Sequence, residues 1–370
     1  MNSRERVIAA INHRRPDRVP LDGYWRTDVW ATLEDYFETT DAEEISEALG
    51  LDIRYSALEP SKDFEERAIP SPWQLEAIGM GRDNLVILRD NGWLEDEYGI
   101  CRAPSSTGLS FSYTYHPLAE AGLEEVKTYQ FPDPEAPERY QRILSDVRRW
   151  KGSHFIMAEL CNILKTSWEL RGFERYMMDL ILEPQLVETL ADRALEHRIA
   201  QSKQLLRGGV DMILMYGDIA MQEGMMLSPQ IWRRYFKPRL KTWLQEVRRE
   251  GDIYFMFHSD GDMEPVFGDV VEIGFDVINP IQPECMDVVA IKRRFGDQVC
   301  LHGTISCQRT LPYGTPEDVE AEVRQRIDCC GRDGGFILSP SNTITPDVSL
   351  ENILALYLTA KNRSLEVTYD

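Results

Sequence analysis

Residues 252–262 of the chain read DIYFMFHSDGD and decide the expected fold. Residues 253–257 are apolar and β-forming, and such a run is typical of a strand that is buried on both faces in a parallel sheet. The run ends in a turn that carries His258, Asp260 and Asp262. Because α/β proteins place their chemistry at the carboxyl ends of parallel strands, we expect this turn to bind a metal or to transfer protons. The structural alternative is a turn whose aspartates cap the next helix while His258 makes a structural hydrogen bond.

The same pattern, an apolar run followed by polar residues and a helix, recurs through the second half of the chain. The other strands expected there cover residues 155–159, 210–216, 275–280, 299–304 and, with its loop, 334–342. Strand-then-helix units repeated over about 200 residues predict a parallel sheet, and we expect an α/β fold, a (β/α)8 TIM barrel. A doubly wound open sheet is the alternative, but the sequence has neither the glycine-rich dinucleotide fingerprint nor the phosphate-binding loop that would favour it.

The N-terminal part of the chain is less regular. Residues 19–25 are expected to form the first inner strand and to deliver Asp22, Tyr24 and Trp25 near its end. Residues 51–115 contain several prolines and glycines and show no clean helical period, so we expect an irregular insertion of short strands and loops over one mouth of the barrel. Residues 1–370 together are expected to form one domain.

The charge of the chain limits its partners. The net charge is −21 and the pI is about 4.8, which argues against nucleic acid or an anionic membrane as the main partner. No apolar run approaches the roughly 20 residues of a membrane span, and the first residues lack the apolar core of a signal peptide. Seven cysteines without regular spacing fit reduced thiols. We therefore expect a cytoplasmic protein that binds neither nucleic acid nor membranes.

Polar residues that follow different strands of a barrel meet around one cavity. The residues expected there are Glu159, Asn162, Asp218, His258, Asp260, Glu284, Cys285 and His302. Structural alternatives exist, because Asp218 could cap a helix, Cys285 could fill apolar space, and His302 could make a hydrogen bond in the core. Their joint occurrence at the strand ends favours a functional site.

Imidazole, thiol and carboxylate groups together suit zinc, which takes nitrogen, sulfur and oxygen donors. We expect His258, Asp260 and Cys285 to hold or approach the metal. Three protein ligands leave one coordination position open, where zinc could deprotonate a thiol or act as a Lewis acid on an ether or alcohol oxygen. Without a metal, Asp218 and Glu284 could act as acid, base or binding partner of a cationic substrate.

Several motifs occur in an order that resembles the uroporphyrinogen decarboxylase superfamily over nearly the whole chain. They are RERV at 4–7, HRRPDRVP at 13–20, SP at 228–229 with Trp232 and YFKP at 235–238, HSDG at 258–261, NP at 279–280 and GGFIL at 334–338. The resemblance implies a (β/α)8 barrel, in agreement with the strand pattern.

This superfamily contains two chemistries. True decarboxylases have an arginine-rich signature of the type R-Q-A-G-R that binds the porphyrinogen carboxylates, whereas residues 21–27 here read LDGYWRT. The chain is more similar to the corrinoid-dependent methyltransferases, which hold zinc with a His-x-Cys motif and a distant cysteine. His258 matches the motif histidine, but Asp260 stands at the cysteine position and Ser339 stands where the distant cysteine would lie. An oxygen-rich metal site, or no metal, is the alternative to zinc.

The resemblance implies a methyltransferase that moves a methyl group between a small methylated substrate and a corrinoid (cobalamin) cofactor on a partner protein. It also makes a homodimer plausible, as in this family. In this interpretation Asp218, Glu284 and His258 are catalytic. The expected substrate-binding residues are Asp22, Tyr24, Trp25, Glu159, Asn162 and His302. One alternative is a decarboxylase of a small carboxylated substrate, which would need a ring of arginines in the pocket. The other is a non-catalytic ligand-binding barrel with a closed pocket.

Overall fold

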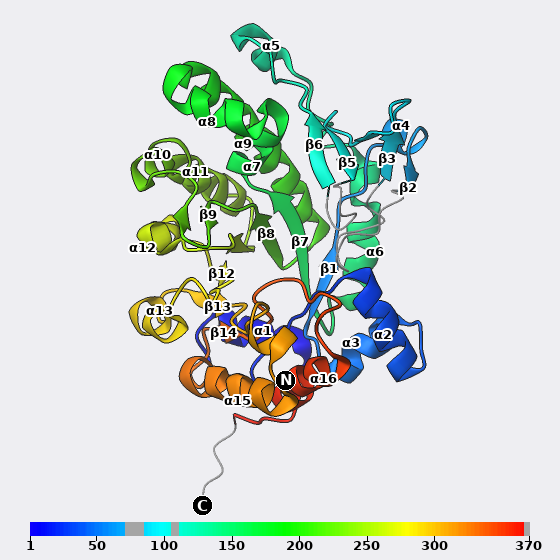
Figure 1. The fold of residues 1–370 in the computed structure, drawn as a ribbon, viewed down its shortest axis with the longest axis vertical. Coiled ribbons are helices and arrows are strands. Elements are labelled where there is room, and N and C mark those ends of the chain that lie inside the picture. Colours follow the sequence, from blue (N-terminus) through cyan, green and yellow to red (C-terminus); the bar gives the residue numbers. More distant parts are fainter. Residues whose placement is uncertain (71–84, 105–110, 366–370) are drawn as a thin grey trace, which may run out of the picture.

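The computed structural model describes residues 1–70, 85–104 and 111–365 of the 370-residue chain. At its centre lies a parallel sheet of seven strands in the order β1–β7–β8–β11–β12–β13–β14 (Figure 1). The strands are β1 (Ile53–Ser56), β7 (Phe155–Cys161), β8 (Met212–Tyr216), β11 (Tyr254–His258), β12 (Val277–Asn279), β13 (Cys300–His302) and β14 (Phe336–Ile337). Their order in the sheet follows their order in the chain, as repeated strand-then-helix units require.

The backbone around Leu21 closes this sheet into a barrel. Leu21 forms a parallel bridge with Leu338, directly after β14, and the Leu338 N–H donates to the Pro20 carbonyl oxygen at 2.9 Å. On the opposite side, the Asp52 N–H donates to the Leu21 carbonyl oxygen at 2.9 Å, just before β1. The segment expected as the first inner strand therefore joins β14 to β1, and the (β/α)8 barrel expected from the sequence is confirmed.

Helices surround the strands (Figure 1). In the first half of the chain they are α1 (Ser3–Ile11), α2 (Thr27–Phe37), α3 (Ala42–Leu49), α4 (Lys62–Glu65), α5 (Leu123–Thr128), the 3-10 helix η1 (Pro137–Tyr140), α6 (Gln141–Trp150), α7 (Ile163–Arg171), α8 (Phe173–Leu182) and α9 (Pro184–Gly208). In the second half they are α10 (Pro229–Tyr235), α11 (Lys237–Arg248), α12 (Glu264–Ile273), α13 (Val288–Phe295), α14 (Thr310–Tyr313), α15 (Pro316–Arg326), the π-helical turn η2 (Ile327–Gly331) and α16 (Leu350–Lys361). Among the described residues, no helix combines the length and the apolarity needed to cross a membrane.

The lower part of the barrel interior is filled by apolar side chains. Alternate residues of each strand point inward, and Met157, Met212 and Met256 meet there in one buried cluster. Val7 and Ile11 of α1 belong to the same cluster. Helix α1 is also bonded to the chain just before β7 and just before β14, so it packs over the amino-terminal end of the barrel. The polar strand ends lie at the opposite end.

A small antiparallel sheet projects from the barrel (Figure 1). Its strands are β2 (Ile69–Pro70), β3 (Leu85–Leu88), β4 (Leu94–Glu95), β5 (Cys101–Pro104) and β6 (Phe111–Tyr115). The Tyr113 hydroxyl donates to Glu169 on α7 at 2.6 Å, which attaches this sheet beside the helix that follows β7. The insertion expected over 51–115 thus begins after β1, which is a barrel strand. Residues 71–84 and 105–110 of that range lie outside the described residues.

A buried carboxylate fixes the junction where the barrel closes. Asp52 is fully buried and accepts hydrogen bonds from Arg6 Nη1 at 2.6 Å, from Arg18 Nη1 at 2.8 Å and from the Leu21 N–H at 2.8 Å. Both arginine side chains are also largely buried. Asp52 therefore joins α1, the closing segment and the start of β1 through one charged group.

We expect Asp52→Ala to lower the free energy of unfolding by about 3–5 kcal/mol, because the largely buried guanidinium of Arg18 loses its carboxylate and that of Arg6 keeps only its pair with Asp17. Urea denaturation followed by tryptophan fluorescence measures this change. Asp35→Ala, on the exposed face of α2, serves as the control and should change the value by less than about 0.5 kcal/mol. Equal urea midpoints for the two variants would contradict the proposed role of Asp52.

Candidate functional site

The inward-facing residues become polar at the carboxyl ends of the strands. Met256, Val277 and Cys300 belong to the apolar interior, and two residues further along each strand come His258, Asn279 and His302. Because the side-chain repeat of a strand is two residues, these three polar groups point to the same interior as the apolar layer below them. The barrel therefore carries a polar layer directly above its apolar core.

A continuous chain of hydrogen bonds crosses this polar layer. The Tyr55 hydroxyl donates to Asp22 Oδ2 at 2.6 Å, and the same oxygen lies 2.9 Å from His302 Nε2. His302 Nδ1 lies 2.6 Å from Asn279 Nδ2, and Asn279 Oδ1 contacts His258 Nδ1. Asp22 and His302, expected from the sequence to bind substrate, are each only 1% exposed and are bonded to each other.

The second ring nitrogen of His258 faces two carboxylates. His258 Nε2 lies 3.8 Å from Asp218 Oδ1, and the ligand atoms of Asp218, His258 and Asp260 all lie within 4.8 Å of one another. The Asp260 N–H donates to Asp218 Oδ1 at 2.9 Å, so the backbone of one loop orients the carboxylate of the other. Cys285, expected as a metal ligand, is not a member of this cluster.

Asp260 has one oxygen with a hydrogen-bond partner and one without. Its Oδ2 accepts from Asn342 Nδ2 at 2.5 Å, whereas its Oδ1 is buried and has no partner within the described structure. Burial raises the pKa of Asp260, His258 opposes this rise, and the neighbouring Asp218 adds to it. A buried acceptor without a donor is costly, and a cation would satisfy it.

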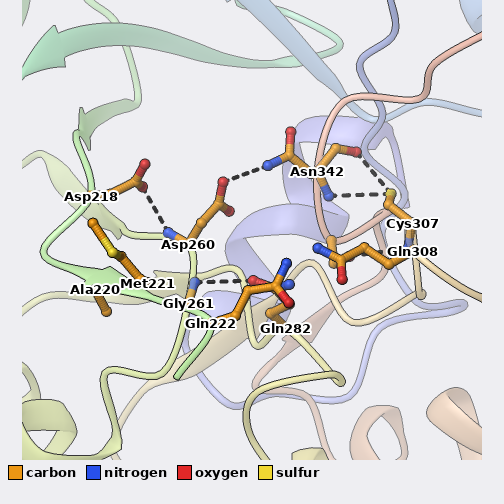
Figure 2. Close-up of a pocket in the computed structure, with 11 residues that line it drawn as sticks. Asp218, Ala220, Met221, Gln222, Asp260, Gly261, Gln282, Cys307, Gln308 and Asn342 are labelled. Carbon is orange, nitrogen blue, oxygen red and sulfur yellow. Dashed lines mark hydrogen bonds between the residues drawn. The ribbon is translucent and has the colours of Figure 1, made fainter. Parts of the chain in front are cut away.

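A cavity of about 300 Å³ opens beside this cluster (Figure 2). Its lining residues are Asp218, Ala220, Met221, Gln222, Asp260, Gly261, Gln282, Cys307, Gln308, Ser341 and Asn342. Figure 2 shows Asp218 and Asp260 on one side and Asn342 and Cys307 on the other. None of these lining residues is an arginine or a lysine. Lys165 lies close by, with its Nζ 5.2 Å from the Tyr216 ring centroid and with Asp218 among its acidic neighbours.

Backbone contacts hold the loops around the cavity together. The Asp262 N–H donates to the Met221 carbonyl oxygen at 2.9 Å, and the Gly261 N–H donates to Gln282 Oε1 at 3.0 Å. Met221 belongs to a hairpin formed by β9 (Ala220–Met221) and β10 (Gly224–Met225). Gly261 has a φ of +85°, and a Cβ there would lie 2.4 Å from the Met221 carbonyl oxygen. Only glycine permits this close approach.

Other residues expected to bind substrate have different surroundings. Asn162 caps α7 by accepting from the Lys165 N–H at 2.8 Å, which is a structural role next to the loop of Asp218. Trp25 is buried, stacks on Trp30 with ring centroids 5.6 Å apart, and does not line the cavity. Glu159 lies on β7. Burial raises the pKa of Tyr55 well above its usual value, the charge of Asp22 adds to this rise, and the charge of Glu159 makes a smaller addition.

Tyr24 and Glu284 lie close to the cavity without lining it. The Tyr24 hydroxyl is buried, makes no hydrogen bond of ordinary geometry within the described structure, and lies beside the Asn279 side chain. Burial, and after it the charge of Asp260, raise the pKa of Tyr24 well above its usual value, so this hydroxyl keeps its proton. Glu284 accepts from the Ser306 hydroxyl, and its other oxygen is buried without a partner there. Both residues therefore remain candidates for contact with substrate.

Sequence reasoning missed Cys307 and Asn342. Cys307 Sγ accepts from the Asn342 N–H at 3.3 Å and donates to the Asn342 carbonyl oxygen at 3.2 Å. Burial raises the pKa of the Cys307 thiol to about 11. Cys307 lies five residues after the end of β13 at His302, and Asn342 lies five residues after the end of β14 at Ile337. Their position shortly after a strand is the sequence feature that could have identified them.

The fold and the cluster define a (β/α)8 barrel with an acid-imidazole site at the carboxyl ends of its strands. A sequence profile described as "Uroporphyrinogen decarboxylase (URO-D)" matches residues 164–363. This range is more than half of the chain, and the chain belongs to the uroporphyrinogen decarboxylase (URO-D) family.

Individual relatives are distant. The uroporphyrinogen decarboxylase of Methylococcus capsulatus is 22% identical over 64% of this chain and 67% of its own length. That of Coxiella burnetii is 22% identical over 50% of both chains, so this chain matches only half of that relative. A solved structure described as a methyltransferase from Methanosarcina mazei is 19% identical, covers 98% of both chains and has a TM-score of 0.69, which shows the same fold.

We expect Gly261→Ala to lower the stability of the protein by about 1–3 kcal/mol, because the added Cβ meets backbone atoms at a positive φ. Thermal unfolding measures this change. Gly268→Ala on α12 is the matched control, since its Cβ would lie 3.6 Å from the Phe295 ring and a helical alanine is neutral or stabilising. A Gly261→Ala protein as stable as the control would show that the two loops do not need this contact.

Proposed function

We propose that this protein is a methyltransferase that moves a methyl group between a small methylated substrate and a corrinoid carried by a partner protein. Asp218, His258 and Asp260 would hold a metal ion, which would supply Lewis acidity at the atom bearing the methyl group. The observation that carries the proposal is the cluster itself, in which one ligand atom from each of Asp218, His258 and Asp260 lies within 4.8 Å of the others. One oxygen of Asp260 is also buried without a hydrogen-bond partner in the described structure.

The donor set fits a divalent metal ion. Zinc in catalytic sites takes three protein ligands from imidazole and carboxylate groups and keeps one position open. The oxygen-rich composition also suits other divalent ions that prefer carboxylates. When bound, the ion supplies Lewis acidity at the oxygen, nitrogen or sulfur atom that exchanges the methyl group.

Several protein groups would position the substrate and its protons. Asn342 orients Asp260 through its side-chain amide, and the Asp260 N–H orients Asp218. The Tyr24 hydroxyl, which stays protonated, is a hydrogen-bond donor for the atom that loses a methyl group. Glu284, fixed by Ser306, is an acceptor on the neighbouring loop.

The lining of the cavity favours this chemistry over decarboxylation. A carboxylated substrate needs cations to hold its carboxylates, and the described residues that line the cavity include no arginine or lysine. The nearby Lys165 already has Asp218 and Glu169 as acidic neighbours. They include instead two aspartates and the amides of Gln222, Gln282 and Gln308, which suit a neutral or cationic polar molecule. The solved structure described as a methyltransferase from Methanosarcina mazei, which covers 98% of this chain, supports the same choice.

The test is metal analysis of freshly purified protein, followed by spectroscopic assay of cob(I)alamin methylation with a panel of small O-, N- and S-methyl compounds. We expect about one bound metal ion per chain and methylation by at least one compound. His258→Gln and Asp218→Asn should each reduce methylation by more than about 100-fold, because a lost ligand exceeds the 10- to 100-fold effect of groups that only orient ligands.

Asp262→Asn is the matched control, because this carboxylate lies in the same turn but caps the Glu264 N–H and is outside the cluster. It should keep both metal and activity. Absence of metal and of methylation across the panel would reject the proposed function, and release of CO2 from a carboxylated substrate would establish the decarboxylase instead.

A further inference from the structure

The hydrogen-bond chain across the polar layer has a direction that begins at Asp22. Asp22 Oδ1 accepts from the Gly23 N–H at 2.9 Å, and Oδ2 accepts from the Tyr55 hydroxyl. A carboxylate has only acceptor sites. The ring nitrogen that faces it, His302 Nε2 at 2.9 Å, must therefore carry a hydrogen and donate it.

This direction passes unchanged through the next two side chains. When a neutral imidazole donates from Nε2, its Nδ1 is an acceptor, so the Asn279 group that faces His302 Nδ1 is the amide Nδ2 donor. The Asn279 carbonyl oxygen is then turned to His258 Nδ1, which must donate. His258 consequently carries its hydrogen on Nδ1, and its Nε2 is a bare lone pair facing Asp218.

We propose that Asp22 is a positioning residue that acts through His302 and Asn279 to keep His258 in the Nδ1–H tautomer, with Nε2 ready to bind a metal ion. Neither Asp22 nor His302 belongs to the group of ligand residues. The hydrogen-bond partner of the second ring nitrogen is known to fix the tautomer and orientation of metal-binding histidines. Here the partner of His258 is the Asn279 amide, and the buried Asp22 carboxylate fixes the orientation of that amide through His302. The inference rests on the metal site of the proposed function.

Asp22→Asn is expected to reverse the whole chain. Its Oδ1 can still accept from the Gly23 N–H, which places the new amide NH2 opposite His302 Nε2. His302 then accepts at Nε2 and donates from Nδ1, and Asn279 must turn its oxygen to His302 and its NH2 to His258. His258 would hold its hydrogen on Nε2 and lose the lone pair that faces Asp218.

The tautomer can be read without metal or substrate by 15N–1H correlation of the histidine side chains in metal-free full-length protein at mildly alkaline pH. The His258 signal is identified by its loss in His258→Gln. We expect a protonated Nδ1 and a bare Nε2 in the natural chain, and the opposite in Asp22→Asn. Tyr55→Phe is the matched control, because it removes one donor to Asp22 but leaves the bond to His302, and it should keep the natural tautomer. A protonated Nε2 in the natural chain would overturn the proposal.

Metal affinity gives a second readout, by titration with Zn²⁺ against a chelator. Asp22→Asn should weaken Zn²⁺ binding about 10- to 100-fold, as expected for a group that orients a ligand, whereas Tyr55→Phe should not. The double variant Asp22→Asn, Asn279→Asp places a carboxylate next to His258 Nδ1 and should restore both the Nδ1–H tautomer and the Zn²⁺ affinity. Such a rescue would show that the single variant Asp22→Asn does not lose affinity through misfolding. No rescue in a folded double variant would overturn the proposal. A bare Nε2 in a protein that binds no metal would reject the proposed function and leave the tautomer assignment standing.

Discussion

The two-residue repeat of the β-strand determines what can meet at the mouth of this barrel. Because Met256, Val277 and Cys300 face the apolar interior, His258, Asn279 and His302 have to face the same interior one step higher. A parallel barrel brings these positions from neighbouring strands to the same height. The polar layer is therefore a consequence of strand register, and its groups must satisfy one another because water is largely excluded there.

The cluster differs chemically from the pattern of a histidine with two cysteines. With Asp260 at the cysteine position, the donors near His258 are carboxylate oxygens, which are harder ligands than thiolates. The carboxylates of Asp218, which is about half exposed, and of Asp260, which is more buried, repel each other. The raised pKa of Asp260 reflects its burial first and this repulsion in addition. A divalent cation would relieve both effects, so the arrangement suits a metal better than it suits an empty pocket.

The sequence was sufficient for the barrel and for the proximity of Asp218, His258 and Asp260. An apolar run followed by HSDG predicted β11 and the meeting of His258 with Asp260, and the position after β8 predicted Asp218. The bond between Asp22 and His302 joins residues 280 positions apart, so no local pattern could predict it. Cys285 and Cys307 are both thiols that follow neighbouring strands, so the sequence does not distinguish them. The conformations of the two loops decide that Cys307 lines the cavity and Cys285 does not. Trp25 was expected near the substrate because it is an aromatic residue at a strand end. In the structure it stacks on Trp30, and its position in the sequence does not predict that packing.

Helix α1 has a consequence for the order of events in the proposed methyl transfer. Val7 and Ile11 fill the amino-terminal end of the barrel together with the inner apolar side chains. A substrate therefore cannot pass through that end. In the proposed function, a small molecule and a protein-bound corrinoid would then both enter at the carboxyl-terminal end, where the described residues form the cavity. The larger partner would cover that entrance when it docks, so the small molecule has to arrive first and its product has to leave after undocking.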